Sequence, residues 1–187
     1  MWHNENHFSI HLSLKPGDSR KLREVSESLG DAYPDLFIPP PDSYAFPVSI
    51  YHFPFPPSLR RKNDPDTIKR YLNQFTRCNF WHPGTIRFSL HSLLISELGL
   101  QLYLTPTAPS DQSMLTRIQQ ELQDHYGCEP CTPTVTIAQL NPRKLFPADA
   151  PETLETLLQK LDREMTAELR SLSLQIQFDN NHTDPWA

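Results

Sequence analysis

Glycine is scarce in this chain of 187 residues, which contains 5 glycines and 19 prolines. Average usage would give about 13 glycines and about 9 prolines at this length. Glycine-rich loops that cradle phosphates need several glycines at fixed spacing, and the chain has neither a GxGxxG motif nor a Walker-type loop. These absences exclude the common glycine-rich nucleotide-binding sites.

The chain also lacks an excess of basic charge and any long apolar run. Its 17 Lys and Arg against 22 Asp and Glu give a net charge of −5, which argues against tight nonspecific binding to nucleic acid. The longest apolar stretch, around 93–100, contains Ser96 and Glu97 and is too short to span a bilayer. The first residues lack the basic and apolar regions of a signal peptide. We therefore expect a cytoplasmic protein with no membrane partner.

The three cysteines form neither a disulfide framework nor a strong metal motif. His125, Cys128 and Cys131 have the spacing H-x₂-C-x₂-C. Structural zinc takes four ligands, usually as two separated pairs. We therefore predict no metal site and no cofactor, and loop thiols without a function are the simplest interpretation.

Hydrophobic periodicity and capping residues predict an α+β fold. Helices are predicted over 18–30, 64–75 and 110–127, and from Pro151 along a stripe of apolar residues that ends at Leu169. Alternating segments rich in β-branched and aromatic residues predict strands over 8–14, 46–53, 85–95, 100–105, 133–140 and 172–178. Proline-dense segments between them should form stiff, extended connectors.

Strand, helix and strand recur in step along the chain. A shift of 87 residues lays Pro47-Val48-Ser49-Ile50 on Thr134-Val135-Thr136-Ile137. A shift of 86 lays the helix start at Pro65 on the helix start at Pro151. Because a duplication places such segments at equivalent sites, we predict that the two strand motifs are structural equivalents.

Residues 46–51 and 133–138 resemble the two motifs of the two-histidine (2H) phosphoesterase superfamily, which includes 2′,5′ RNA-ligase-like and cyclic nucleotide phosphodiesterase proteins. Each family motif reads His-x-Thr/Ser-x and lies on a strand of one of two pseudo-symmetric lobes. The resemblance covers most of the chain in topology. It implies two lobes of antiparallel sheet, around 46–105 and 110–178, with outer helices flanking a central cleft. They would form one domain over 1–179, followed by a polar tail at 180–187.

Both family histidines are replaced in this chain, by Pro47 and Thr134, while the hydroxyl positions Ser49 and Thr136 are kept. In the family, one histidine acts as general base, the other as general acid, and the hydroxyls hold phosphate oxygens. Neither proline nor threonine titrates near neutral pH, and losing general acid–base help typically costs about 10²–10⁴-fold per group. The resemblance therefore implies a catalytically degenerate protein that binds a small nucleotide, an RNA end or another phosphorylated ligand.

The expected ligand-binding residues are Ser49, Thr136, Tyr51 and Arg87. Strand alternation puts Ser49 and Tyr51 on one face and His52 on the other. Tyr51 belongs to an aromatic cluster that either stacks on a base or packs between sheet and helix. Arg87, inside a strand, would grip a phosphate through two N–H groups or pair with a carboxylate.

Two alternatives stay open. An active 2′,3′-cyclic nucleotide or RNA phosphodiesterase would use relocated histidines drawn from His11, His52 and His91, and it requires at least two of them to converge. His11-Leu12-Ser13-Leu14 is a literal His-x-Ser-x match. The other alternative is a protein-interaction module without a ligand pocket.

Overall fold

The structure, a computed structural model, describes residues 7–54, 84–96, 99–127, 130–141, 143–145, 147–159, 161 and 164–177. Its elements in chain order are β1 (His7–Leu14), α1 (Pro16–Ala32), β2 (Phe37–Ile38), β3 (Val48–Pro54), β4 (Thr85–Ser96), β5 (Gly99–Pro106), α4 (Pro109–Tyr126), β6 (Pro130–Leu140), α5 (Ala150–Leu158) and β7 (Glu164–Gln177). The predicted α+β class is confirmed. The helix predicted over 64–75 and the tail at 180–187 lie outside the described residues.

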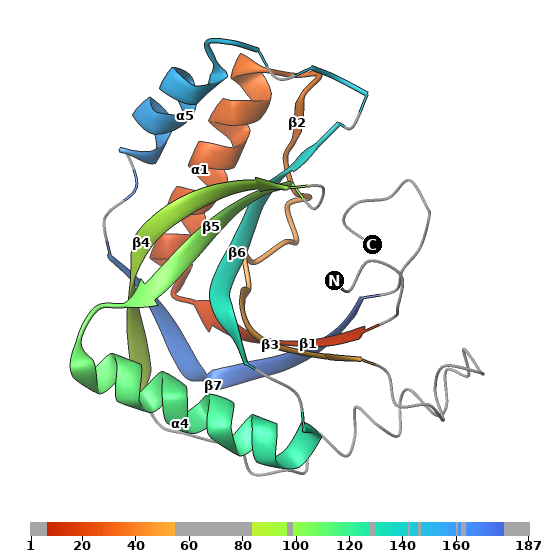
Figure 1. Cartoon of the computed structure of the whole chain (residues 1–187). Helices are drawn as coiled ribbons and strands as arrows, with labels where there is room; N and C mark the ends of the chain where they lie inside the picture. The colour runs from red at the N-terminus through yellow and green to blue at the C-terminus, as the bar shows by residue number, and fades with distance from the viewer. Residues whose placement is uncertain are drawn as a thin grey trace.

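Six of the seven described strands form one closed antiparallel barrel (Figure 1). The strand order is β2-β6-β3-β1-β7-β4-β5, and β6 also pairs with β5, which closes the ring. Closure gives both sides of each barrel strand a hydrogen-bonding neighbour and removes exposed sheet edges. The short strand β2 lies outside the ring and pairs with the end of β6.

The two predicted lobes are not confirmed as separate sheets. β3 from the first predicted lobe pairs with β6 from the second, and β4 pairs with β7. Both halves therefore share one sheet, because separate lobes would leave the edge strands unpaired. If β1 is exchanged with β5, β3 with β6 and β4 with β7, the order of strands around the ring stays the same. The strand order is thus compatible with a duplication even though the halves are merged.

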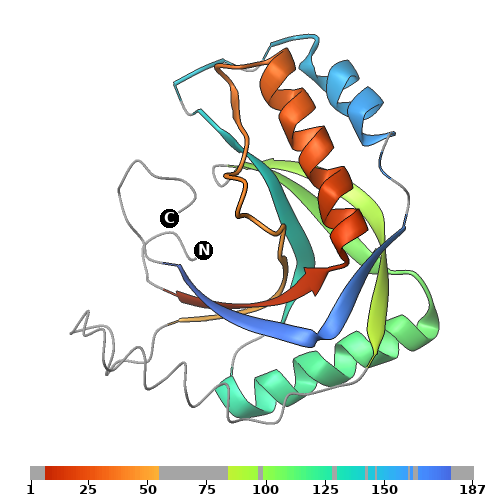
Figure 2. The ribbon, with the colours of Figure 1, turned by 180° about the vertical axis from the view of Figure 1, so that it is seen from behind.

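The helices α1 and α4 pack apolar stripes against the barrel, and α5 packs against α1. In both views α4 lies along the outside of the strand layer, beneath β1, β3 and β7 (Figures 1 and 2). Its Leu115, Ile118 and Leu122 are buried at helical spacing. α4 ends at Gly127, whose φ of 75° is left-handed and whose N–H donates to the Gln123 carbonyl oxygen. Among the described residues, no helix has the length and apolarity needed to cross a membrane.

The helix predicted from Pro151 to Leu169 is too long. α5 ends at Leu158, and residues from Glu164 onward form β7. Met165, Ala167 and Leu169 are buried, whereas Glu168 between them is exposed. This alternation has the period of a strand, although Met165 and Leu169 alone also fit a helix. Pairing with β4 and β1 decides in favour of the strand.

The proline-dense connector before β3 is held by Arg23 of α1. One guanidinium nitrogen of Arg23 donates to the backbone oxygens of Tyr44 at 2.6 Å and Asp42 at 3.0 Å. The guanidinium also lies 5.3 Å from the ring centre of Phe46. Phe46 is fully buried with a φ of 50°, a left-handed conformation that is unfavourable for a bulky residue. Arg23 therefore fixes the strained entry to β3.

Replacement of Arg23 by methionine should lower the free energy of unfolding by about 2 kcal/mol, since hydrogen bonds from a charged donor are each worth about 1.5–3 kcal/mol. The methionine keeps much of the apolar stem and removes the donors. Urea denaturation measures the change. Arg20→Met, on an exposed position of the same helix, should change stability by less than about 0.5 kcal/mol. Equal effects of the two substitutions would contradict the role given to Arg23.

Candidate functional site

A β-bulge at Ile50 changes which side chains of β3 share a face. Ile10 of β1 lies opposite Tyr51, and the next residue, His11, lies opposite Ser49, so Ile50 is an extra residue on β3. One inserted residue reverses the alternation beyond it. His52 therefore joins the face of Ser49, while Tyr51 turns to the opposite face and is fully buried. The predicted separation of His52 from Ser49 was wrong for this reason.

Two serine–histidine pairs lie on the face that the bulge creates. The Oγ of Ser49 is 3.0 Å from Nε2 of His52, and the Oγ of Ser9 is 2.6 Å from Nε2 of His11. The strand register puts Ser9 opposite His52 and His11 opposite Ser49, a spacing of about 4.5–5.5 Å between Cβ atoms. We call these four residues the serine–histidine block. Ser9, His11 and Ser49 are buried, and His52 is half-buried.

The same face continues across β6 and β5 with hydroxyl and amide side chains. Thr134 of β6 lies opposite Ser49, and Tyr103 of β5 lies opposite Thr134. Thr136 shares the face of Thr134 two residues away, and its Oγ1 accepts a hydrogen bond from Gln101 Nε2 at 3.3 Å. The two kept motif hydroxyls, those of Ser49 and Thr136, thus lie on one face of neighbouring strands.

Cys131 adds a thiol beside the serine–histidine block. Burial raises the pKa of the Cys131 thiol to about 12, and its hydrogen bond with Ser49 opposes this with a smaller effect. The thiol is therefore protonated at neutral pH and is a poor nucleophile. Within the described part of the chain, no group of three or more His, Cys, Asp or Glu residues could hold a metal ion. Cys128 and the side chain of His125 lie outside it.

Arg87 pairs with carboxylates, the second of the two roles considered for it. Its Nη2 lies 3.2 Å from Asp111 and its Nη1 lies 3.9 Å from Glu164. The buried carboxylate of Asp111 also accepts the backbone N–H groups of Ala108 and Arg87 at the start of α4. The Arg87 guanidinium is therefore paired with the carboxylate that caps the start of α4. A phosphate-binding role for Arg87 stays a prediction.

Of the remaining candidate positions, His91 lies on a strand apart from the serine–histidine block, whereas Pro47 is two residues before Ser49. His91 is exposed at an irregular point of β4, a strand that pairs with β5 and β7 and not with β1 or β3. Pro47 is half-buried and immediately precedes β3. Of the three candidate substitute histidines, the structure therefore brings together His11 and His52.

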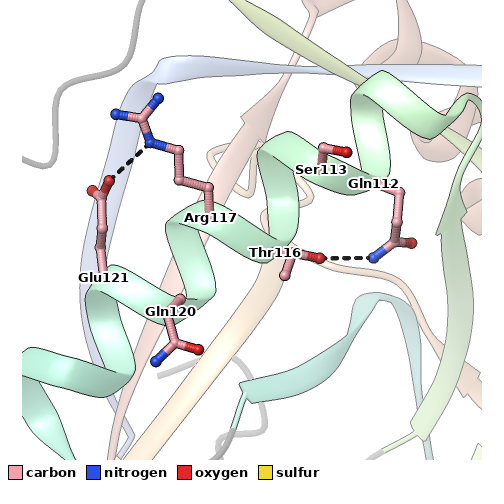
Figure 3. A pocket seen from close by; sticks show the side chains of 6 residues that line it. All are labelled: Gln112, Ser113, Thr116, Arg117, Gln120 and Glu121. Atoms are coloured by element: carbon pink, nitrogen blue, oxygen red, sulfur yellow. Dashed lines mark hydrogen bonds and ion pairs between the residues drawn. The ribbon is translucent and has the colours of Figure 1, made fainter.

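A surface depression on α4 is separate from this face (Figure 3). It is lined by Gln112, Ser113, Thr116, Arg117, Gln120 and Glu121. All six side chains come from one helix, and two contacts along that helix, between Gln112 and Thr116 and between Arg117 and Glu121, occupy polar groups. A ligand site normally needs walls from more than one element to bury its ligand. We assign no function to this depression.

No protein-family model matches the chain, and no curated protein matches it. Among solved structures, one of Usb1 from Kluyveromyces marxianus is similar with a TM-score of 0.40 and 10% sequence identity, over 93% of this chain and 97% of that chain. A structure of the same Usb1 with uridine monophosphate gives a TM-score of 0.39 and 11% identity, over 92% and 97%.

The serine–histidine block contains the groups that acid–base catalysis on a phosphate ester requires. Imidazole is the side chain whose unperturbed pKa lies nearest neutral pH, so it can both accept and donate a proton. Hydroxyl groups can donate hydrogen bonds to phosphate oxygens. Because the two imidazoles lie on one face of neighbouring strands, both can contact a small substrate bound on that face.

Proposed function

We propose that this chain is a two-histidine phosphoesterase-like protein that hydrolyses a 2′,3′-cyclic nucleotide or a cyclic phosphate at an RNA end. The observation that supports this most directly is the serine–histidine block on β1 and β3. The sequence favoured a degenerate site because Pro47 and Thr134 replace both motif histidines and because regular alternation turned the substitute His52 away from Ser49. The bulge at Ile50 removes the second of these reasons.

The proposed roles follow from exposure. His52 is half-buried and has the better access to solvent, so it serves as general base and takes a proton from the attacking water. The water oxygen bonds to phosphorus while the bond from phosphorus to one ribose oxygen breaks. His11, protonated beforehand, gives its proton to that leaving oxygen. The hydroxyls of Ser9 and Ser49 stabilise the charge that develops on the remaining phosphate oxygens.

A second candidate function is binding of the same ligands without turnover. The observation in its favour is the burial of Ser9 and His11, which are 0% and 5% exposed. If His11 does not reach the leaving oxygen, the acid step is lost. The half-buried hydroxyls of Thr134 and Thr136 would still offer hydrogen bonds to a phosphorylated ligand.

The two functions are separated by incubating the full chain with 2′,3′-cyclic mononucleotides and a short RNA that ends in a 2′,3′-cyclic phosphate. We expect conversion to a phosphomonoester, seen by ³¹P NMR, and saturable binding by calorimetry. Binding without conversion would support the second candidate and contradict the first. Absence of both would overturn both and favour a protein-interaction module. Ser49→Ala should weaken binding, whereas Ser113→Ala, on the outer side of α4, should not.

A further inference from the structure

Gln119 of α4 spans the two motif strands at the bulge. Its Nε2 donates to the backbone oxygens of Ile50 on β3 and Cys131 on β6, both at 3.0 Å. A side-chain amide has two N–H donors, so one Gln119 side chain satisfies both carbonyl groups. Ile50 is the extra residue of the bulge, and Gln119 is therefore bonded to the backbone at the point where the alternation of β3 reverses.

The second carbonyl belongs to an equally irregular stretch. Ser49 lies opposite Thr134 and Tyr51 lies opposite Pro130, so residues 131–133 of β6 face Ile50 alone. The regular ladder between β3 and β6 is interrupted there. Partly buried carbonyl groups without a donor are costly, and Gln119 provides the donor that the neighbouring strand would otherwise supply. Leu115, Ile118 and Leu122 hold α4 against the sheet on the same side.

We propose that Gln119 is a positioning residue for the serine–histidine block. By satisfying the Ile50 carbonyl outside the ladder, it stabilises the bulged register that sets His52 against Ser49. Without that donor, the Ile50 carbonyl group loses a hydrogen bond and the bulge opens more readily, so that His52 is no longer held against Ser49. The catalytic consequence rests on the proposed function, but the placement of His52 does not.

The test compares Gln119→Leu with Gln120→Leu in the full chain without ligand. The leucine at 119 keeps much of the volume and removes both donors. Gln120 is the matched control, because its amide lies on an exposed part of α4 and donates to Asp124 at 2.8 Å. A third variant, Gln119→Lys, restores an N–H donor. Each histidine is modified with diethyl pyrocarbonate, and the rate at each position is followed by mass spectrometry of peptides.

We expect Gln119→Leu to raise the modification rate of His52 by about tenfold through local opening. The rates of buried His11 and exposed His91 should not change. Gln120→Leu should leave all three rates unchanged, and Gln119→Lys should restore the slow rate at His52. An unchanged His52 rate in Gln119→Leu would overturn the inference. So would an equal rise at His11, which indicates general loosening, or a failure of lysine to restore the slow rate.

The modification rates test the role of Gln119 independently of the proposed function. If the wild-type chain neither binds nor cleaves a cyclic nucleotide, the proposed function fails, and the His52 rate still decides the role of Gln119. If the wild-type chain is active, Gln119→Leu should lower kcat and leave KM nearly unchanged, since Gln119 bonds to backbone oxygens of β3 and β6 and acts on the substrate only through His52. A change confined to KM would contradict a positioning role.

Discussion

Alanine at His52 is expected to lower kcat/KM for a 2′,3′-cyclic nucleotide by about 10²–10⁴-fold, the usual contribution of one general acid or base. This corresponds to about 3–5 kcal/mol of transition-state stabilisation. The loss should appear in kcat, because the imidazole acts on the proton that moves in the transition state and not on the bound ground state. Initial rates over a range of substrate concentrations, followed by chromatography of the product, separate the two parameters.

Two further variants make this result specific. His11→Ala should reduce kcat to a similar degree, and the double variant should lose less than the product of the two single effects, because the groups act as a unit. His91→Ala is the control, since His91 is exposed on β4, and its kcat/KM should stay within about twofold of wild type. Full activity of the His52 variant would refute the assigned role of its imidazole.

Alanine at Gly99 should lower the free energy of unfolding by about 3–4 kcal/mol, from backbone strain of about 1–3 kcal/mol plus overpacking. The φ of Gly99 is 115°, a conformation that side chains other than glycine rarely adopt. An added Cβ would also overlap the carbonyl oxygen of Ala138 and lie 2.9 Å from Cα of Gln139. Both neighbours are backbone atoms of β6, so they cannot rotate away.

The effect of Gly99→Ala should be large because Gly99 lies at the seam where β5 and β6 close the barrel. Its neighbour Leu100 is paired with Ala138. Gly17→Ala provides the contrast: Gly17 is in the first turn of α1 with nothing within 4 Å of an added Cβ, and alanine there should raise stability by up to about 1 kcal/mol. Chemical denaturation followed by circular dichroism measures both. A Gly99 variant as stable as wild type would show that the seam adjusts.

Local patterns predicted most elements, and long-range pairing explains the errors. The alternation over 100–105 and the glycine cap at Gly127 depend only on residues close in sequence, and they correctly predicted β5 and the end of α4. Residues 164–169 fit two periods, and contacts with β1 and β4 selected the strand. β2 was missed because Phe37 and Ile38 pair with residues about a hundred positions later. A single domain over 1–179 and a cytoplasmic location stay predictions.

Regular alternation predicts the shared face of the serine–histidine block on β1 but not on β3. Ser9 and His11 alternate with apolar residues along β1, so their common face follows directly from sequence. On β3, the apolar pair Ile50-Tyr51 stands between Ser49 and His52, which breaks the alternation. A bulge within this doublet is compatible with the pattern, because one extra residue puts Ser49 and His52 on the same face.

The pairing of β1 with β7 has a consequence for synthesis of the chain. The first described strand is flanked on one side by the last, with His7 opposite Gln177, so β1 gains its second neighbour only after β7 has been synthesised. Closing such distant segments is slow, because the entropy of a long loop must be lost before the contacts form. A nascent chain halted before Glu164 would expose one flank of β1 to other polypeptides, and this makes it a natural substrate for chaperones.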